Sequence, residues 1–213
     1  MLEQITGQSL ADYMHHHIFD RLDMDSTMFN ISTITDGAER LVDFAVPSSD
    51  DPNVLIPGTS WGPKSPFSIY SGGAGLSTTT SDYAKFLQAT LRGDLLDKSM
   101  RELIFKPQLT NTERKALNKL ATNNWDALMP ALYPRGAPID HSLGGIVSLK
   151  DSPVGRKKGS VMWYGAVNSW WWIDRETGIA AVMTTQIDGA PNHPATLRLL
   201  KELEQAVYQH LLV

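Results

Sequence analysis

The sequence contains no cysteine among its 213 residues, which excludes disulfides, thiol catalysis and thiolate metal sites. It also has no long apolar run, since segments such as Trp170–Ile173 are far too short to span a bilayer. Met1–Ile5 lacks the charged region and apolar core of a signal peptide. Charge of neither sign dominates, because 19 basic and 23 acidic residues give a net charge of −4. That balance is not the basic field that nucleic acid or an anionic membrane requires, so we expect a cytoplasmic protein without either partner.

The composition is otherwise that of a globular protein, with 42% apolar and 20% charged residues. The length suits one domain and is short for two. Residues 30–75 are rich in Ser, Thr, Asp, Pro and Gly, and the prolines interrupt any long element. We expect a long irregular segment there, draped over the core.

Helices are predicted on both sides of that segment. Ser9 and Asp12 form a capping-box pattern ahead of apolar residues at helical spacing. Thr79 is placed to cap a second helix, which Gly93 ends. Shorter helices are expected near 98–106 and 111–121.

The last third of the chain has the pattern of strands. The expected strands, rich in Val, Ile, Trp and Thr, lie around 144–149, 160–164, 168–173 and 179–186. Asp174–Gly178 is typical of a hairpin loop, and the continuous apolar run Ile179–Met183 predicts a strand covered on both faces. A closing helix is expected after Pro194. This order of elements predicts an α+β fold, with an antiparallel sheet between residues 144 and 186 flanked by helices.

Three consecutive histidines, His15, His16 and His17, invite comparison with a metal site. Consecutive residues of a helix point about 100° apart, so the three imidazoles do not converge on one ion. We therefore expect no metal here.

Residues Gly58–Gly62 match the Gly-x-Ser-x-Gly nucleophile elbow, with Ser60 as the nucleophile. His141 and His193 follow in the order that a catalytic triad of this type requires. The elbow needs a strand-to-helix turn, and prolines on both sides disfavour a helix directly after Ser60. An α/β hydrolase that uses Ser60 remains an alternative.

A combination of three segments carries a stronger signal. Leu2–Leu10 leads into His17–Met24, Tyr70–Thr78 leads into Asp82–Leu87, and Gly159–Gly165 leads into a Trp-rich segment, Asp174 and Gln186. In this order and spacing, the segments resemble the serine β-lactamase-like family, in the esterase and fungal acyltransferase (transesterase) branch related to class C β-lactamases. The resemblance covers essentially the whole chain. It implies a β-lactamase/transpeptidase-like fold.

The resemblance also implies nucleophilic acyl transfer without a cofactor. In this family a serine attacks an ester, thioester or amide carbonyl, a lysine and a tyrosine manage its proton, and two backbone N–H groups bind the oxyanion. Trp163, Tyr164 and Gly165 match the Trp-x-Gly form of a family element carried on an edge strand. They are the implied substrate-binding residues, and the N–H of Ala166 is the implied catalytic oxyanion donor. For Trp163, an ordinary packed aromatic is the alternative.

The sequence departs from the family in what it lacks. No serine has a lysine three residues later, and no tyrosine has an asparagine two residues later. Met1 aligns past the point where the family carries both motifs, so the resemblance implies that the N-terminal half is missing. We expect 1–213 to be a single partial domain, with mostly helix and loop over 1–140 and antiparallel strands plus a C-terminal helix over 141–213. Arg21 and Asp23 also replace the proline and glycine of the Pro-Leu-Gly-Met turn.

The favoured interpretation is a C-terminal fragment of a serine hydrolase or acyltransferase, inactive alone. Its expected partner is a small-molecule acyl substrate, once an N-terminal half completes the fold. A non-catalytic β-lactamase-like binding module is the alternative from another class. Because the family's sheet combines strands from both ends of the chain, we also expect association through an exposed apolar sheet face.

Overall fold

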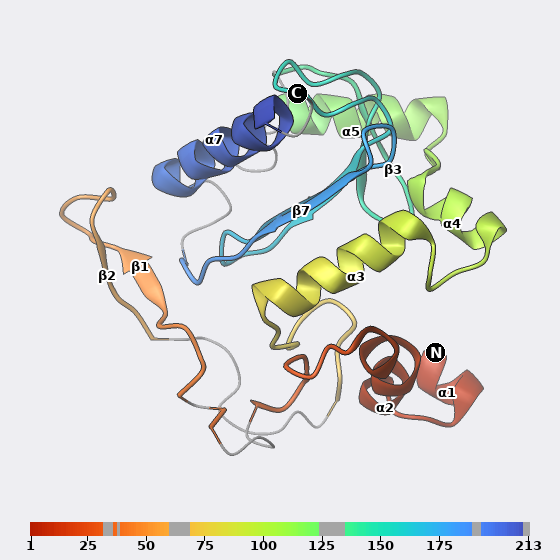
Figure 1. Ribbon diagram of the computed structural model, residues 1–213. Helices are drawn as coiled ribbons and strands as arrows, with labels where there is room; N and C mark the ends of the chain where they lie inside the picture. Colours follow the sequence, from red (N-terminus) through yellow and green to blue (C-terminus); the bar gives the residue numbers. More distant parts are fainter. Residues whose placement is uncertain (32–35, 38, 60–68, 124–134, 189–192, 211–213) are drawn as a thin grey trace.

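A five-stranded antiparallel sheet forms the centre of the molecule, with helices on both faces (Figure 1). The computed structural model describes residues 1–31, 36–37, 39–59, 69–123, 135–188 and 193–210. The strands follow one another in chain order: β3 (Ile139–His141), β4 (Ile146–Ser148), β5 (Val161–Tyr164), β6 (Trp170–Asp174) and β7 (Ile179–Met183). The predicted antiparallel sheet is confirmed, and β3 is an addition that the sequence pattern did not indicate.

The helices begin and end close to the predicted residues. They are α1 (Leu2–Thr6), α2 (Leu10–Met14), α3 (Thr80–Arg92), α4 (Lys98–Phe105), α5 (Asn111–Asn123) and α7 (Pro194–His210). The Ser9 hydroxyl accepts a hydrogen bond from the N–H of Asp12, and the Thr79 hydroxyl accepts one from Asp82. Gly93 ends α3 with φ 87°, a left-handed conformation that favours glycine. Local capping chemistry therefore sets these boundaries.

The N-terminal helical region continues past α2 in a π-helical turn, His15–Phe19, and a short 3₁₀ turn, Asp20–Leu22. Asp23 then takes the left-handed conformation with φ 51°. Asp23 therefore occupies a left-handed backbone conformation that glycine adopts without steric strain.

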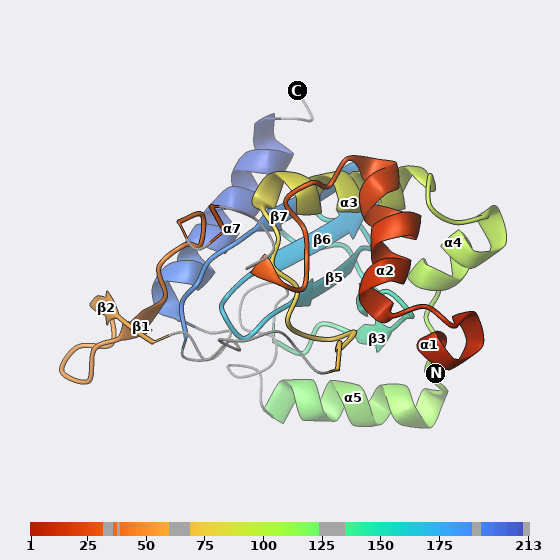
Figure 2. The same cartoon turned by 90° about the horizontal axis from the view of Figure 1, so that it is seen from below.

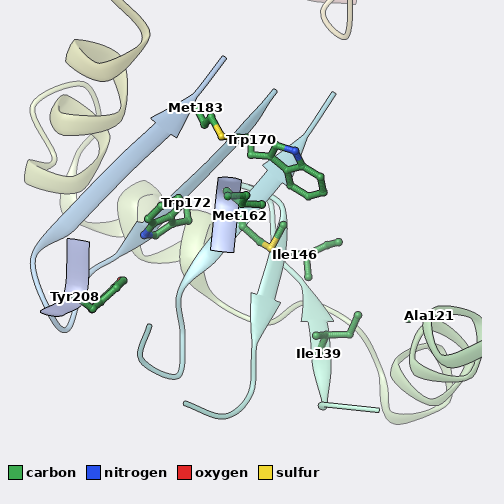
Figure 3. Packing of buried hydrophobic residues seen from close by; sticks show 9 residues of the cluster. Ala121, Ile139, Ile146, Met162, Trp170, Trp172, Met183 and Tyr208 are labelled. Atoms are coloured by element: carbon green, nitrogen blue, oxygen red, sulfur yellow. The ribbon is translucent and has the colours of Figure 1, made fainter. Parts of the chain in front are cut away.

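Two apolar clusters lie on the two faces of the sheet. On one face, Met162, Trp170 and Trp172 pack with Leu200 and Tyr208 of α7 (Figure 3). On the other face the second cluster lies against α3 and α4; its buried members are Leu87, Phe105, Val147, Val161 and Ile173. Figure 2 shows the same layers from below, with α5 beside β3. The sheet is therefore a layer between helices.

Both faces of β7 pack against apolar clusters, as its apolar sequence predicts, and its residues are half-buried except for the buried Met183. Ile179 and Ala181 belong to the cluster under α7, whereas Ala180 and Val182 belong to the cluster under α3. At β7 the two apolar faces are thus half-buried by helices, and association through an exposed apolar sheet face stays a prediction. What β7 leaves open is its outer edge, because among the described strands it pairs only with β6.

A buried ion pair fastens α7 to the loop before β5. The Arg156 Nε donates to Glu204 Oε1 at 2.6 Å, and both side chains are almost fully excluded from solvent. Arg156 also lies over the Trp172 ring, 5.6 Å from its centroid. Burial raises the pKa of the Glu204 carboxyl, against the opposing effect of Arg156.

The described residues of the segment expected to be irregular include a regular feature. Strands β1 (Ala45–Pro47) and β2 (Leu55–Pro57) form a two-stranded antiparallel ribbon that projects from the body (Figure 1). The base of the ribbon is hydrogen-bonded to the segment after β7, since the Ala45 N–H donates to the Gln186 carbonyl at 2.9 Å. Elsewhere, none of the helices in the described ranges is long and apolar enough to cross a membrane.

Candidate active site

Strand β5 carries the Trp-x-Gly element, but it is an interior strand. Strand β4 pairs with its first half, up to Ile146 opposite Met162, and β6 pairs along its whole length. The prediction that the Trp-x-Gly element lies on an edge strand is therefore wrong. The hairpin of β3 and β4 flanks β5 on the side away from β6. Within the described residues, the side of β5 toward β4 has no ladder partner beyond Met162, so Trp163 and Tyr164 extend past the part of β5 that pairs with β4.

Trp163 and Tyr164 form part of an aromatic group at this end of the sheet. Trp163 is 43% exposed, and its ring lies 5.6 Å from that of His141 and 5.9 Å from that of Tyr164. Tyr164 in turn packs against Trp170, with 4.7 Å between ring centroids. Burial raises the pKa of the Tyr164 phenol. Trp163 is thus a partly exposed aromatic surface backed by a packed one.

Gly165 leaves open space where other residues would place a side chain. A Cβ added there would meet no atom within 4 Å, and its φ lies outside the left-handed region. Neither the packing nor the backbone conformation of the described residues therefore requires glycine at this position. A requirement for close approach by another molecule would explain it.

Residues 165–168 form the tight turn between β5 and β6, and Ala166 lies in this turn, one residue past Gly165. The Gly165 N–H donates to the Ser169 carbonyl at 2.9 Å, and the Asn168 N–H donates to the Gly165 carbonyl at 3.1 Å. Ala166 is exposed, and within the described residues its N–H donates to no acceptor. The turn therefore holds one free backbone donor next to the open position at Gly165.

Asn168 anchors this turn from beneath. It is fully buried and has φ 60°, a left-handed conformation that asparagine tolerates better than most residues. Its Nδ2 donates to the Ile187 carbonyl at 2.9 Å, and its Oδ1 accepts from the Thr196 hydroxyl at 3.0 Å. The turn is thereby tied to the segment after β7 and to the first turn of α7.

Asn168 was not singled out from the sequence, and His141 was named only as a possible triad partner of Ser60. An asparagine before a serine between two strand patterns is a signal for a left-handed turn residue, and it could have identified Asn168. His141 has no comparable signal, because its contact with Trp163 depends on the β3–β4 pairing. The His141 Nδ1–H donates to the Ser142 carbonyl at 2.6 Å, which fixes the ring beside Trp163.

The Ser60 interpretation meets a different fold. A nucleophile elbow belongs to a parallel α/β sheet, whereas every strand pair among the described residues is antiparallel. The α/β-hydrolase alternative is therefore wrong, while Ser60 itself lies outside the described residues. Of its candidate partners, His193 is buried, and its Nε2–H donates to the Pro52 carbonyl at 3.0 Å.

The three consecutive histidines go to separate neighbours. His15 lies 2.9 Å from the Asp20 carboxylate, His16 donates to the Asp12 carbonyl, and His17 packs on Tyr13. Across the described parts of the chain, no group of three or more acidic or histidine side chains is arranged to hold a metal ion.

Comparisons with known proteins extend over the whole chain. A family model described as "Beta-lactamase" matches residues 1–205. "Acyltransferase calJ" from Penicillium decumbens is 31% identical over 202 residues, which cover 91% of this chain and 46% of that protein. "Lovastatin esterase" from Penicillium rubens is 27% identical over 198 residues, covering 87% of this chain and 47% of that protein.

Among solved structures, "Simvastatin Synthase (LOVD), from Aspergillus Terreus, LovD6 mutant" superposes with a TM-score of 0.91 at 25% identity. The superposition covers 98% of this chain and 52% of that one. The chain therefore spans about half the length of the relatives that it matches.

Proposed function

The chain belongs to the β-lactamase family, and from this premise we propose that it is the C-terminal part of a serine acyltransferase or esterase. The predicted β-lactamase/transpeptidase-like fold is confirmed, as is the resemblance to fungal acyltransferases. The similar proteins include one named as an acyltransferase and one named as an esterase. Both reactions transfer an acyl group from a serine, and they differ in whether an alcohol or water receives it.

The observation that carries the proposal is the free N–H of Ala166 beside the open position at Gly165. When a serine oxygen adds to an acyl carbonyl, the carbonyl oxygen becomes an oxyanion that needs a fixed hydrogen-bond donor. The hydrogen-bonded turn holds the Ala166 N–H in place, so no reorganisation is needed when the charge develops. Gly165 lets the acyl group lie against the strand, and Trp163 and Tyr164 supply an aromatic wall for it.

The remaining groups of the reaction are proposed to come from an N-terminal part. This chain has no Ser-x-x-Lys, which is the family's source of nucleophile and proton acceptor. The open outer edge of β7 supports such an arrangement, since an unpaired strand edge is a template for further strands. We propose that added strands pair there and bring the serine toward the Ala166 turn.

The first test is the activity of the chain alone. Purified 213-residue protein should hydrolyse p-nitrophenyl butyrate at the rate of a heat-denatured control, because nucleophile, base and half of the oxyanion hole are absent. Robust turnover would contradict the proposal. A Ser60→Ala variant would then show whether that serine is the nucleophile.

The second test supplies the missing part. The transcript upstream of the Met1 codon is read for an in-frame Ser-x-x-Lys, and the longer protein is expressed. Turnover should appear, and Gly165→Val should lower kcat/KM by at least tenfold without changing the unfolding midpoint of the 213-residue chain, since the side chain enters open space. A longer protein that carries the motif and remains inactive would favour the non-catalytic binding module. An unchanged kcat/KM in Gly165→Val would mean that the acyl group does not bind next to Gly165.

A further inference from the structure

A cavity of about 480 Å³ lies at the opposite end of the sheet from the Ala166 turn. It is lined by Glu102, Phe105, Lys106, Lys158, Gly159, Arg175 and Glu176. These residues come from the end of α4, the loop before β5 and the β6–β7 hairpin loop. Gly159 precedes β5 and Ala166 follows it, and the four residues of β5 alone span about 13 Å. The cavity is therefore separate from the proposed acyl-transfer site.

One wall of the cavity is a guanidinium group held flat. Arg175 lies over the Phe105 ring, with its central carbon 4.8 Å from the ring centroid. Its two terminal nitrogens donate to the two oxygens of Glu102, at 3.2 and 2.7 Å. The Arg175 hydrogen bond and charge lower the pKa of the Glu102 carboxyl, so this carboxylate stays ionised and keeps the fork in place. A planar group fixed on both its edge and one face is suited to stacking with a ring.

Two lysines supply the charge. Lys106 and Lys158 are exposed residues from different elements, and neither ammonium donates a hydrogen bond to any residue that the structure describes. Lys106 is also the C-cap residue of α4, where its charge opposes the negative end of the helix dipole that would repel an anion. With Glu102 paired to Arg175, the lining charges without an ion-pair partner among the described residues are the two lysines and Glu176, while the charge of Lys158 also lowers the pKa of the nearby Asp151. The cavity therefore favours a ligand with a negative charge.

We propose that this cavity binds a phosphomonoester carried on a ring-bearing, hydroxylated body, as in a nucleoside monophosphate. The two lysines bind the phosphate oxygens, and the exposed side of the Arg175 plane stacks on the ring. The Glu176 carboxylate accepts from a hydroxyl group of the body. A volume of this size is within the range of small-molecule sites, which is about 300–1,000 Å³. The inference is independent of the acyl-transfer proposal and is tested on this chain as it is.

Isothermal titration calorimetry at constant ionic strength compares AMP, adenosine and inorganic phosphate as probes. We expect AMP to bind at least tenfold more tightly than either fragment, because only AMP satisfies the lysines and the Arg175 plane together. A Lys106→Ala/Lys158→Ala variant should lose at least tenfold in AMP affinity. The matched control is Lys119→Ala/Lys201→Ala, which removes two exposed lysines from α5 and α7 and should change affinity less than twofold.

Several outcomes would overturn the proposal. Absence of AMP binding to the unmodified chain at millimolar concentrations removes the site. Equal affinity for adenosine and AMP would show that the cavity does not bind the phosphate. Equal affinity for inorganic phosphate and AMP would show that the cavity does not bind the ring. Equal loss in the two double variants shows general charge attraction instead of this cavity. All substituted lysines are exposed, and an unchanged unfolding midpoint verifies that each variant folds.

Discussion

Removing Arg156 should destabilise the protein more than any surface charge, because it leaves the Glu204 carboxylate buried without its counter-ion. The Arg156 side chain is 0% exposed and that of Glu204 is 1% exposed. Breaking a buried pair of this kind from one side costs about 3–5 kcal/mol. Arg156→Met keeps the length and apolar contacts of the side chain and removes only its charge and hydrogen bonds. The free energy of unfolding in urea at pH 7, followed by tryptophan fluorescence, measures the loss.

Two further variants isolate the ion pair. Arg156→Met/Glu204→Leu removes both charges and should recover to within about 1 kcal/mol of the unmodified protein, since a buried pair is often replaceable by apolar residues. Arg198→Met is the matched control, because Arg198 pairs with Glu202 on the exposed face of the same helix at 3.9 Å. It should change stability by less than about 0.5 kcal/mol.

The loss of stability in Arg156→Met should also depend on pH, in a direction set by the pKa of Glu204. The pKa of Glu204 is raised in the fold by burial, and removal of Arg156 raises it further. A carboxyl group with a raised pKa contributes stability that is present below its unfolded pKa and is lost as the pH rises through its folded pKa. The deficit of Arg156→Met should therefore be smaller at pH 5 than at pH 7. A loss below about 1 kcal/mol, a double variant as unstable as the single one, or a deficit that grows at pH 5 would refute this reasoning.

Three further substitutions test the packing of the turns and caps by the same unfolding measurement. Gly155→Ala should cost about 3 kcal/mol or more, because a Cβ there would lie 2.3 Å from the Tyr208 ring and φ is 142°; a loss under 1 kcal/mol would contradict the close contact. Asn168→Ala should lower the free energy of unfolding by about 3 kcal/mol and Asn168→Gly by less, since glycine keeps the left-handed backbone but not the side-chain hydrogen bonds. Equal losses in the two variants would mean that the left-handed conformation of residue 168 does not contribute to the difference. Thr79→Ala should cost about 1 kcal/mol and Thr79→Ser almost nothing, because serine retains the cap on α3.

Local signals explain which elements the sequence could predict. Helix α3 has a capping threonine, an apolar stripe and a terminal glycine, and each is visible without knowledge of the fold. Strand β3 lacks such signals, because Asp140 is at its centre. That aspartate is fully buried and accepts from the N–H groups of Gln108 and Leu109 and from Arg114. These partners are 26 to 32 residues distant in sequence, so the pattern alone indicates a loop.

In the candidate site, too, the residues of a local motif could be predicted from the sequence, whereas the contacts between distant segments could not. The Trp-x-Gly motif predicts Trp163, Tyr164, Gly165 and Ala166 together because they are consecutive in the sequence. The position of β5 inside the sheet depends on its pairing with β4, and the support of the turn depends on Asn168 reaching Ile187 and Thr196. Such contacts are set by tertiary packing, which a single sequence does not display.

The order of the strands has a consequence for synthesis of the chain. Every ladder in the larger sheet joins strands that are consecutive in sequence, so the contacts are local and the loops close with little loss of chain entropy. Helix α3 is different, because the β7 residues that cover its apolar face are made much later: Ile179 comes 87 residues after Arg92. At a ribosomal rate of about 5–20 residues per second, Leu87 and its neighbours wait about 4–17 s for that cover. During that interval the apolar face of α3 lacks the cover that β7 later gives it and is open to non-specific association.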